Sequence, residues 1–303
     1  MNEASKNHLY EVVLPQQFLL GEGPLWDAKR NRICWIDILN GMIHELEPSS
    51  GTHHEIEVHD LIGTIALCRG GGYLAALKAG LAYVDGNTSE ITFLFDPEPH
   101  MPENRFNDGK CDSSGRLWLG SMSLSEQEGA GSLYRIDQDR SCTLQLGGMT
   151  IPNGMAWSPD HKKFYHIDTP TRQIKAYDFD LASGEISNGR VVIEVPEPEG
   201  FPDGMTIDSE GMLWIAHFNG WQVARWDPQL GKKLFSFDLP VSQVTSCAFG
   251  GPTLTDLYIT TASKELNAAQ LEEQPQAGSL FVIKDCGFKG MESFRFNYNP
   301  ALG

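Results

Sequence analysis

The chain has 303 residues, of which 41% are hydrophobic, and its 31 glycines and 17 prolines are typical of a turn-rich globular β protein. The formal net charge of −17 argues against proteins that need a basic face. We therefore predict no nucleic-acid partner and no anionic membrane surface.

Short apolar strands alternate with glycine, proline, asparagine and aspartate turns along almost the whole sequence. Residues 1–8 are polar and are expected to be frayed, whereas residues 9–14 read as a strand before the first repeating unit. This beginning does not resemble a secretory signal, so the cytoplasm is the expected location. The six cysteines are scattered without a C-x-x-C pair, which predicts reduced core residues.

From residue 20 onward the strands and turns fall into units of similar length. The expected strands are, in chain order, residues 33–37, 43–46, 73–76, 117–119, 133–136, 165–168, 174–178, 213–215, 223–226, 257–259 and 279–283. A proline-rich loop at residues 96–102 precedes the third unit, and an insertion at residues 124–131 interrupts it. An insertion of this length is more often functional than idle. Residues 267–273 are the one helical segment that we predict.

A polar residue recurs at the start of four units, and we call its position the slot. An aspartate or serine follows it five residues later, and an apolar strand begins at the tenth or eleventh. The four slot residues are Glu22, Asn107, Asn153 and Asp203. The steps between the last three are 46 and 50 residues, and the gap of 85 before Asn107 leaves room for one more unit.

Two further units align with these four, and the second unit has lost its polar slot residue. The strand at 73–76 places the slot of the second unit at Ile62 or Gly63, and the strand at 257–259 places that of the sixth at Ser246 or Cys247. Six units with a period in the forties predict an all-β, six-bladed β-propeller. We expect one domain over residues 1–303. Residues 9–14 should pair in the same blade as residues 279–283, because closing the ring removes exposed strand edges.

Equivalent repeat positions converge on the axis of a propeller, so the four slot residues should meet at one channel mouth. Each offers side-chain oxygen, and the set contains no cysteine or histidine. Such a set suits a hard divalent cation such as calcium, magnesium or manganese, with zinc less favoured. Taken singly, the Asn-Gly and Asp-Gly pairs fit tight turns equally well. Their shared register at the start of strands favours the metal site.

Four motifs together resemble one known family, the senescence marker/regucalcin and gluconolactonase family. They are Gly-Glu-Gly-Pro-Leu-Trp at residues 21–26, Arg-Phe-Asn-Asp-Gly at 105–109, Asn-Gly at 153–154 and Pro-Asp-Gly at 202–204. The likeness extends to Thr-Ser-Cys-Ala-Phe-Gly-Gly at residues 245–251. The resemblance implies a six-bladed propeller that hydrolyses sugar lactones with a divalent cation.

The resemblance also implies roles for single residues. Glu22, Asn153 and Asp203 would hold the metal, and Asp203 would act as general base as well. Arg105 and Asn107 would bind the substrate. The mammalian members have an acidic pair where this chain has Leu124 and Ser125, a difference that bears on sugar specificity.

Two other functions remain open from the sequence. The same channel mouth could hydrolyse another electrophile, such as an organophosphate or an aryl ester. The chain could instead be a non-catalytic calcium-binding regulator. Arg105, a fixed cation beside the expected metal residues, argues against a simple ion buffer. The family resemblance implies a small-molecule sugar lactone as the partner.

Overall fold

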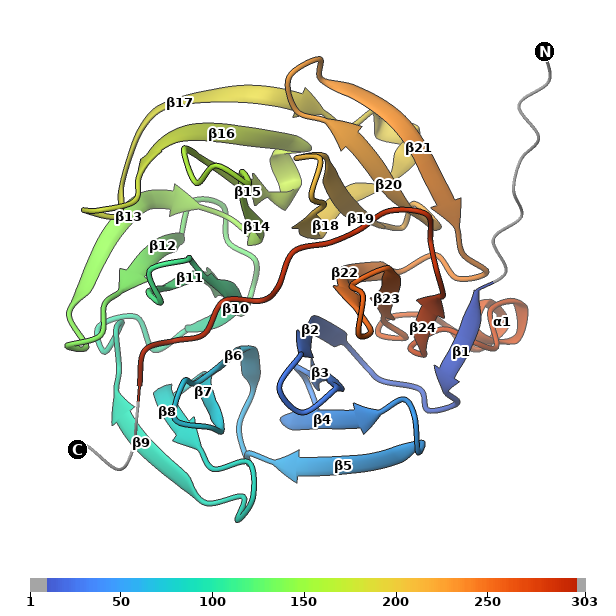
Figure 1. The fold of residues 1–303 in the computed structure, drawn as a ribbon, viewed down its shortest axis with the longest axis horizontal. Coiled ribbons are helices and arrows are strands. Elements are labelled where there is room, and N and C mark those ends of the chain that lie inside the picture. Colours follow the sequence, from blue (N-terminus) through green and yellow to red (C-terminus); the bar gives the residue numbers. More distant parts are fainter. Residues whose placement is uncertain (1–9, 299–303) are drawn as a thin grey trace.

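The computed structural model describes residues 10–298. Within this range the chain forms six four-stranded antiparallel sheets, arranged as the blades of a β-propeller around a central axis (Figure 1). The expected fold class is confirmed. Residues 1–8, expected to be frayed, and residue 9 of the predicted first strand lie outside the described residues.

The blades share one order of strands from the axis outward. The inner strands are β2 (Gly21–Asp27), β6 (Ile62–Leu67), β10 (Asn104–Cys111), β14 (Pro152–Trp157), β18 (Phe201–Ile207) and β22 (Val244–Gly250). The second strands are β3 (Arg32–Asp37), β7 (Tyr73–Leu77), β11 (Leu117–Ser123), β15 (Lys163–Asp168), β19 (Leu213–Phe218) and β23 (Asp256–Thr261). The third strands are β4 (Met42–Glu47), β8 (Gly80–Val84), β12 (Gly131–Ile136), β16 (Gln173–Asp180), β20 (Gln222–Asp227) and β24 (Leu280–Ile283). The outer strands are β5 (Thr52–Glu57), β9 (Ile91–Phe95), β13 (Cys142–Met149), β17 (Glu185–Glu194), β21 (Lys232–Asp238) and β1 (Glu11–Leu14).

The sixth blade closes the ring with strands from both ends of the chain. The N-terminal strand β1 pairs with the C-terminal strand β24, so that Glu11 lies opposite Val282 and Leu14 opposite Leu280. The predicted pairing is therefore confirmed over residues 11–14. The predicted helix is also present, as α1 (Ala268–Glu273), with Asn267 as its N-cap. Two short 3-10 helices, η1 (Thr169–Thr171) and η2 (Glu197–Glu199), add to it.

Apolar side chains between neighbouring blades form the core, and three fully buried tryptophans, Trp35, Trp118 and Trp214, sit in the second strands. All six cysteines are free, as expected. Five are buried, but Cys142 is exposed on the outer strand β13 and is not a core residue. No helix in residues 10–298 is long and apolar enough to cross a membrane.

Every inner strand has a break in its pairing register close to the slot. The break falls between Glu22 and Leu25 in β2 and between Asn153 and Met155 in β14, and at matching places in the other four blades. Such β-bulges bend a strand and redirect a side chain. In the second and sixth blades the bulge lies at Gly63 and Thr245. The slot of the sixth blade is therefore one residue before the predicted Ser246, or two before the predicted Cys247.

The inner strands also pack closely, which explains the glycines beside the slot. A Cβ atom on Gly63 would lie 2.3 Å from the backbone oxygen of Phe106, and one on Gly204 would lie 2.1 Å from Ser246 Oγ. Real Cβ atoms do not approach other atoms so closely. These positions therefore need glycine for space, and the neighbouring slot residues are brought together as a result.

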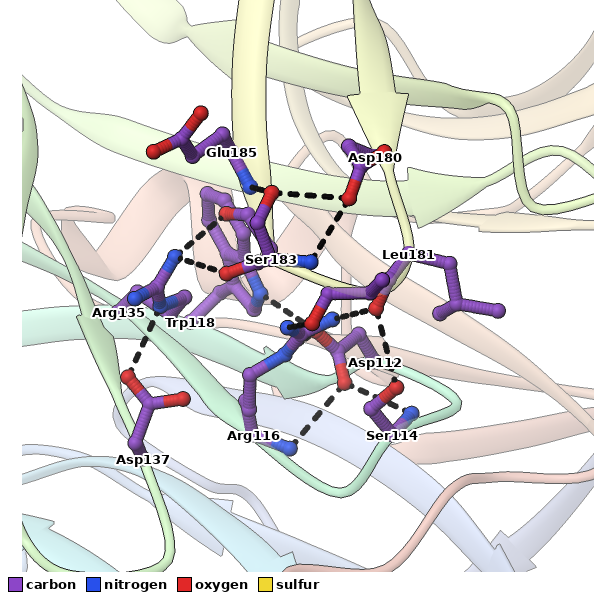
Figure 2. A network of polar contacts seen from close by, with 12 residues as sticks. Asp112, Ser114, Arg116, Trp118, Arg135, Asp137, Asp180, Leu181, Ser183 and Glu185 are labelled. Atoms are coloured by element: carbon purple, nitrogen blue, oxygen red, sulfur yellow. Dashed lines mark hydrogen bonds and ion pairs between the residues drawn. The ribbon is translucent and has the colours of Figure 1, made fainter.

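In three blades an aspartate lies five places after the slot and closes the turn at the far end of the inner strand, as Figure 2 shows for Asp112. Asp112 accepts hydrogen bonds from Arg116 Nε at 2.7 Å and Trp118 Nε1 at 3.1 Å, and also from two backbone N–H groups. Asp208 repeats this pattern with Trp214 and Arg225. These repeated carboxylates are structural, because each is fully occupied by the fold.

The C-terminal segment, residues 284–298, crosses the face of the propeller over the centre of the ring (Figure 1). It hydrogen-bonds to the turns at the far end of the inner strands. Phe296 N donates to Leu67 O, and the Ser209 and Asn297 amides donate to Lys289 O and Gly115 O. Residues 291–294 close a small cavity of about 90 Å³ in the channel. This face is therefore covered by the chain itself, and the slot face is the opposite one.

Candidate functional site

The slot residues lie together in a cavity of about 360 Å³ at the uncovered mouth of the channel. Glu22, Asn153, Asp203, Arg105 and Asn107 all line it. Five blades contribute lining residues, so the cavity exists only when the ring is complete. Its volume falls within the range of small-molecule binding sites.

The Asn153 side chain is held by its amide nitrogen, which leaves its oxygen free. Asn153 Nδ2 donates to Thr169 Oγ1 at 3.1 Å, and that hydroxyl donates in turn to Pro202 O at 2.9 Å. Asn153 Oδ1 is buried and has no hydrogen-bond partner among residues 10–298. A buried acceptor without a partner is costly, so this oxygen would be stabilised by a bound cation or hydrogen-bond donor.

Asn107 lies in the equivalent position of the neighbouring blade but is satisfied within the protein. Its Nδ2 donates to Pro152 O at 3.0 Å, and its Oδ1 accepts from Arg105 Nη1 at 2.8 Å. Arg105 Nη1 also donates to Phe106 O at 2.9 Å. The two asparagines of the slot are thus distinct, because only the oxygen of Asn153 is left unpaired.

Two buried carboxylates complete the group. Burial and the charges of Asp203 and Asp108 raise the pKa of Glu22 well above its usual value. Burial and Asp108 likewise raise the pKa of Asp203, although Lys264 and the Asn153 side chain act in the opposite direction. The only hydrogen bond to Glu22 shown for the described residues is that from Gly23 N, at 2.7 Å. The repulsion between these carboxylates would be relieved by a cation between them.

The donor set therefore fits a hard divalent cation. Two carboxylates line the cavity, those of Glu22 and Asp203. The amide oxygen is the unpaired Oδ1 of Asn153. Calcium, magnesium and manganese prefer such ligands. No histidine or cysteine lines this cavity within residues 10–298, so zinc is a less suitable occupant.

Arg105 provides positive charge in the same cavity. Burial lowers the pKa of Arg105 to about 10, while Glu126, Glu22 and Asp203 act in the opposite direction. A guanidinium with this pKa is still charged at neutral pH. It has five N–H donors, and the two contacts described above use only one of its nitrogens. Arg105 can therefore bind further oxygen atoms in the cavity.

Several residues of the site were not identified from the sequence. Glu126 lines the cavity from the insertion at residues 124–131, next to Leu124 and Ser125. Lys264 lines it from the segment after β23, and Thr169 from η1. Asp108 adjoins the slot residue Asn107 and lines the small cavity deeper in the channel. Two of them could have been identified from the sequence, because Asp108 lies in the motif at residues 105–109 and Glu126 in the insertion at residues 124–131.

Comparison with known proteins identifies the family of this chain. Residues 20–263 match the family model described as SMP-30/Gluconolactonase/LRE-like region. The chain is 35% identical to regucalcin of Xenopus laevis, over 94% of this chain and 97% of that protein. It is 37% identical to a Bacillus subtilis protein named as a proposed sugar lactone lactonase, YvrE, over 87% of this chain and 90% of the other.

A solved structure gives the same result in three dimensions. The calcium-binding protein regucalcin of Agrobacterium tumefaciens superposes with a TM-score of 0.89 at 30% identity, over 95% of this chain and 96% of the other. The match to the family model spans more than half of the chain, and the relatives cover nearly all of it. The protein therefore belongs to the SMP-30/Gluconolactonase/LRE-like family.

Proposed function

We propose that this protein hydrolyses a sugar lactone to the corresponding aldonic acid, with a divalent cation held by Glu22, Asn153 and Asp203. The observation that carries the proposal is the unpaired Asn153 Oδ1 beside two buried carboxylates in an open cavity. The resemblance to the Bacillus protein named as a proposed sugar lactone lactonase supports the choice of substrate class.

When bound, a divalent cation supplies Lewis-acid polarisation of the lactone carbonyl and stabilises negative charge on its oxygen. Asp203 accepts a proton from the water that attacks the carbonyl carbon. The ring C–O bond then breaks, and the proton passes from Asp203 to the ring oxygen, which becomes a hydroxyl group. The free carboxylic acid ionises as it leaves.

Arg105 and Asn107 orient the substrate. The hydrogen bond from Arg105 to Asn107 Oδ1 fixes both side chains, and their attachment to Pro152 ties them to the next blade. Fixed donors placed around a neutral sugar ring cost little to reorganise and therefore favour a single binding pose. The lactone is uncharged and is not repelled by the acidic site, whereas the anionic product is.

The test is a pH-indicator assay of acid release from pentono- and hexonolactones. The protein is first stripped of metal with a chelator and then supplied with calcium, magnesium, manganese or zinc separately. We expect turnover that requires a divalent cation. A phosphotriester and an aryl ester in the same panel test the other hydrolase functions. Calcium binding without turnover of any substrate would contradict the proposal and favour a calcium-binding regulator.

A further inference from the structure

Three possible ligand side chains lie on one face of the first blade, away from the channel mouth. His44 is in the third strand, β4, and lies directly opposite Glu55 in the outer strand, β5. His53 precedes Glu55 by two residues and therefore points to the same face of β5. The sheet register alone brings the three side chains together.

We propose that His44, His53 and Glu55 form a second metal site, suited to zinc and its neighbours among the transition metals. His44 Nδ1 lies 3.2 Å from His53 Nε2 and 3.4 Å from Glu55 Oε1. Within residues 10–298 this is the only group of three His, Cys, Asp or Glu side chains whose ligand atoms all lie within 4.8 Å of one another.

The distances match tetrahedral coordination. Zinc binds imidazole nitrogen at about 2.0–2.1 Å, so two ligands of a tetrahedral site lie roughly 3.3–3.4 Å apart. The two measured separations from His44 Nδ1 are close to this value, and small movements would accommodate the ion. Two imidazoles and one carboxylate are a common ligand set for zinc sites with one open position.

The surroundings hold the ligands in place. Trp35 stacks on His44 at 5.1 Å and on His53 at 5.7 Å between ring centroids, and Phe18 packs against His44. Gln16 Nε2 donates to Glu55 Oε1 at 3.2 Å and so orients the carboxylate. The Glu55 side chain is 43% exposed, which gives the metal access from solvent and allows water to fill the fourth position.

The histidines are in the form that binds metal. Burial lowers the pKa of His44 to about 4 and also lowers the pKa of His53, so both rings are neutral at neutral pH. A neutral imidazole keeps the lone pair that coordinates metal. His44 Nε2 has no hydrogen-bond partner among the described residues. Because metal-binding histidines usually donate from the second nitrogen, we expect affinity about 10–100-fold below that of a fully supported site.

A hydrogen bond between the two imidazoles is the simpler explanation for their proximity, and a metal titration distinguishes the two. Metal-free protein is titrated with zinc by calorimetry in excess calcium, which occupies oxygen-rich sites, and with cobalt(II) by visible absorption. Tetrahedral cobalt absorbs far more strongly than octahedral cobalt. The variants are His53→Ala and Glu55→Gln. His54→Ala is the matched control, because this neighbouring histidine points to the other face of β5.

We expect wild type and His54→Ala to bind one more zinc equivalent than His53→Ala, and to give strong cobalt absorption that His53→Ala lacks. Glu55→Gln should bind zinc at least 10-fold more weakly. Equal zinc stoichiometry in wild type and His53→Ala, or cobalt absorption unchanged by His53→Ala, would overturn the proposal. Lactone turnover by His53→Ala with calcium should equal that of wild type, so the outcome is independent of the proposed activity.

Discussion

In the first, third and fifth blades the two ends of the inner strand carry similar polar residues in different surroundings. At the far end, Asp27, Asp112 and Asp208 accept hydrogen bonds from arginine and backbone groups. At the slot end, Glu22 and Asp203 are buried without a cationic partner at ion-pair distance in residues 10–298. The pKa of Asp27 lies below its usual value, whereas the pKa values of Glu22 and Asp203 lie above theirs. We therefore propose that one set of residues holds the blade and that the other set binds a ligand.

Asp27 and Glu22 show the contrast within a single strand, β2. Burial alone would raise the pKa of Asp27, but hydrogen bonds from Arg30 and Arg295 hold it below its usual value. Burial and neighbouring carboxylates raise the pKa of Glu22. A buried acid that is not compensated by the protein is a candidate for function, whereas a compensated one is a candidate for stability. The following predictions test this division.

The largest expected effect is on catalysis at the slot. Asp203→Asn keeps an oxygen ligand but removes the only group there proposed to accept a proton, since an amide has no useful basicity. We expect kcat to fall by about 10²–10⁴ at saturating metal. Asn153→Asp, the reverse exchange, should bind metal at least as well and lose far less activity. Near-native turnover by Asp203→Asn, with metal occupancy checked independently, would place the base elsewhere.

The next effect is on stability at the far end. Asp112→Ala leaves the buried Arg116 without its carboxylate, and such losses typically cost about 3–5 kcal/mol in the free energy of unfolding. Denaturant unfolding measures this change. Asp137→Ala, which removes a more exposed arginine partner, should cost about 0–1 kcal/mol. Folded Asp112→Ala should keep its metal affinity, and a loss of affinity would show that the two ends are not independent.

A smaller effect concerns the support of the metal residues. Thr169→Val removes the hydroxyl that holds Asn153 and leaves a side chain of similar size. We expect metal affinity to fall about 10–100-fold, with kcat recovered at saturating metal. Thr171→Val, in the same short helix, alters a hydroxyl that bonds to Asp168 O instead and should leave affinity unchanged. Equal affinity in both variants would mean that the Asn153 orientation does not depend on Thr169.

The smallest effect is the pH dependence of stability without metal. Because the pKa of Glu22 is raised, this carboxyl binds more protons in the folded state than in the unfolded state. Glu22 therefore destabilises the fold increasingly as the pH rises above about 4. The loss in the free energy of unfolding is at most about 1.4 kcal/mol per pH unit. Glu22→Gln should therefore gain stability over wild type as pH rises. Asp27→Asn should do the reverse, because the lowered pKa of Asp27 stabilises the fold above about pH 4.

The measurement is thermal or denaturant unfolding of metal-free protein between pH 4 and pH 8. Differences between each variant and wild type cancel the contribution of the buried histidines, which have lowered pKa values and act in the other direction. Saturating calcium should reverse the Glu22→Gln difference. Parallel pH profiles for wild type and both variants would contradict the division between the two ends.

The repeat explains what could be predicted from the sequence. The blades, the closure by β1 and the gathering of the four slot residues follow from a fixed spacing, which a sequence shows directly. Thr169 and Lys264 could not be found in this way, because they lie on connections whose path has no repeat. The unequal roles of Asn107 and Asn153 depend on hydrogen bonds to neighbouring blades, which no local pattern reveals.

The pairing of β1 with β24 also sets the order in which the molecule can be made. Glu11 is synthesised early, but its partner Val282 follows 271 positions later. At about 5–20 residues per second the whole chain takes roughly 15–60 s, and blades one to five can form during that time. The channel mouth, however, takes lining residues from the sixth unit. A chain interrupted before residue 280 would keep two unpaired strand edges and an incomplete ring, so errors late in translation should be the ones most exposed to aggregation and proteolysis.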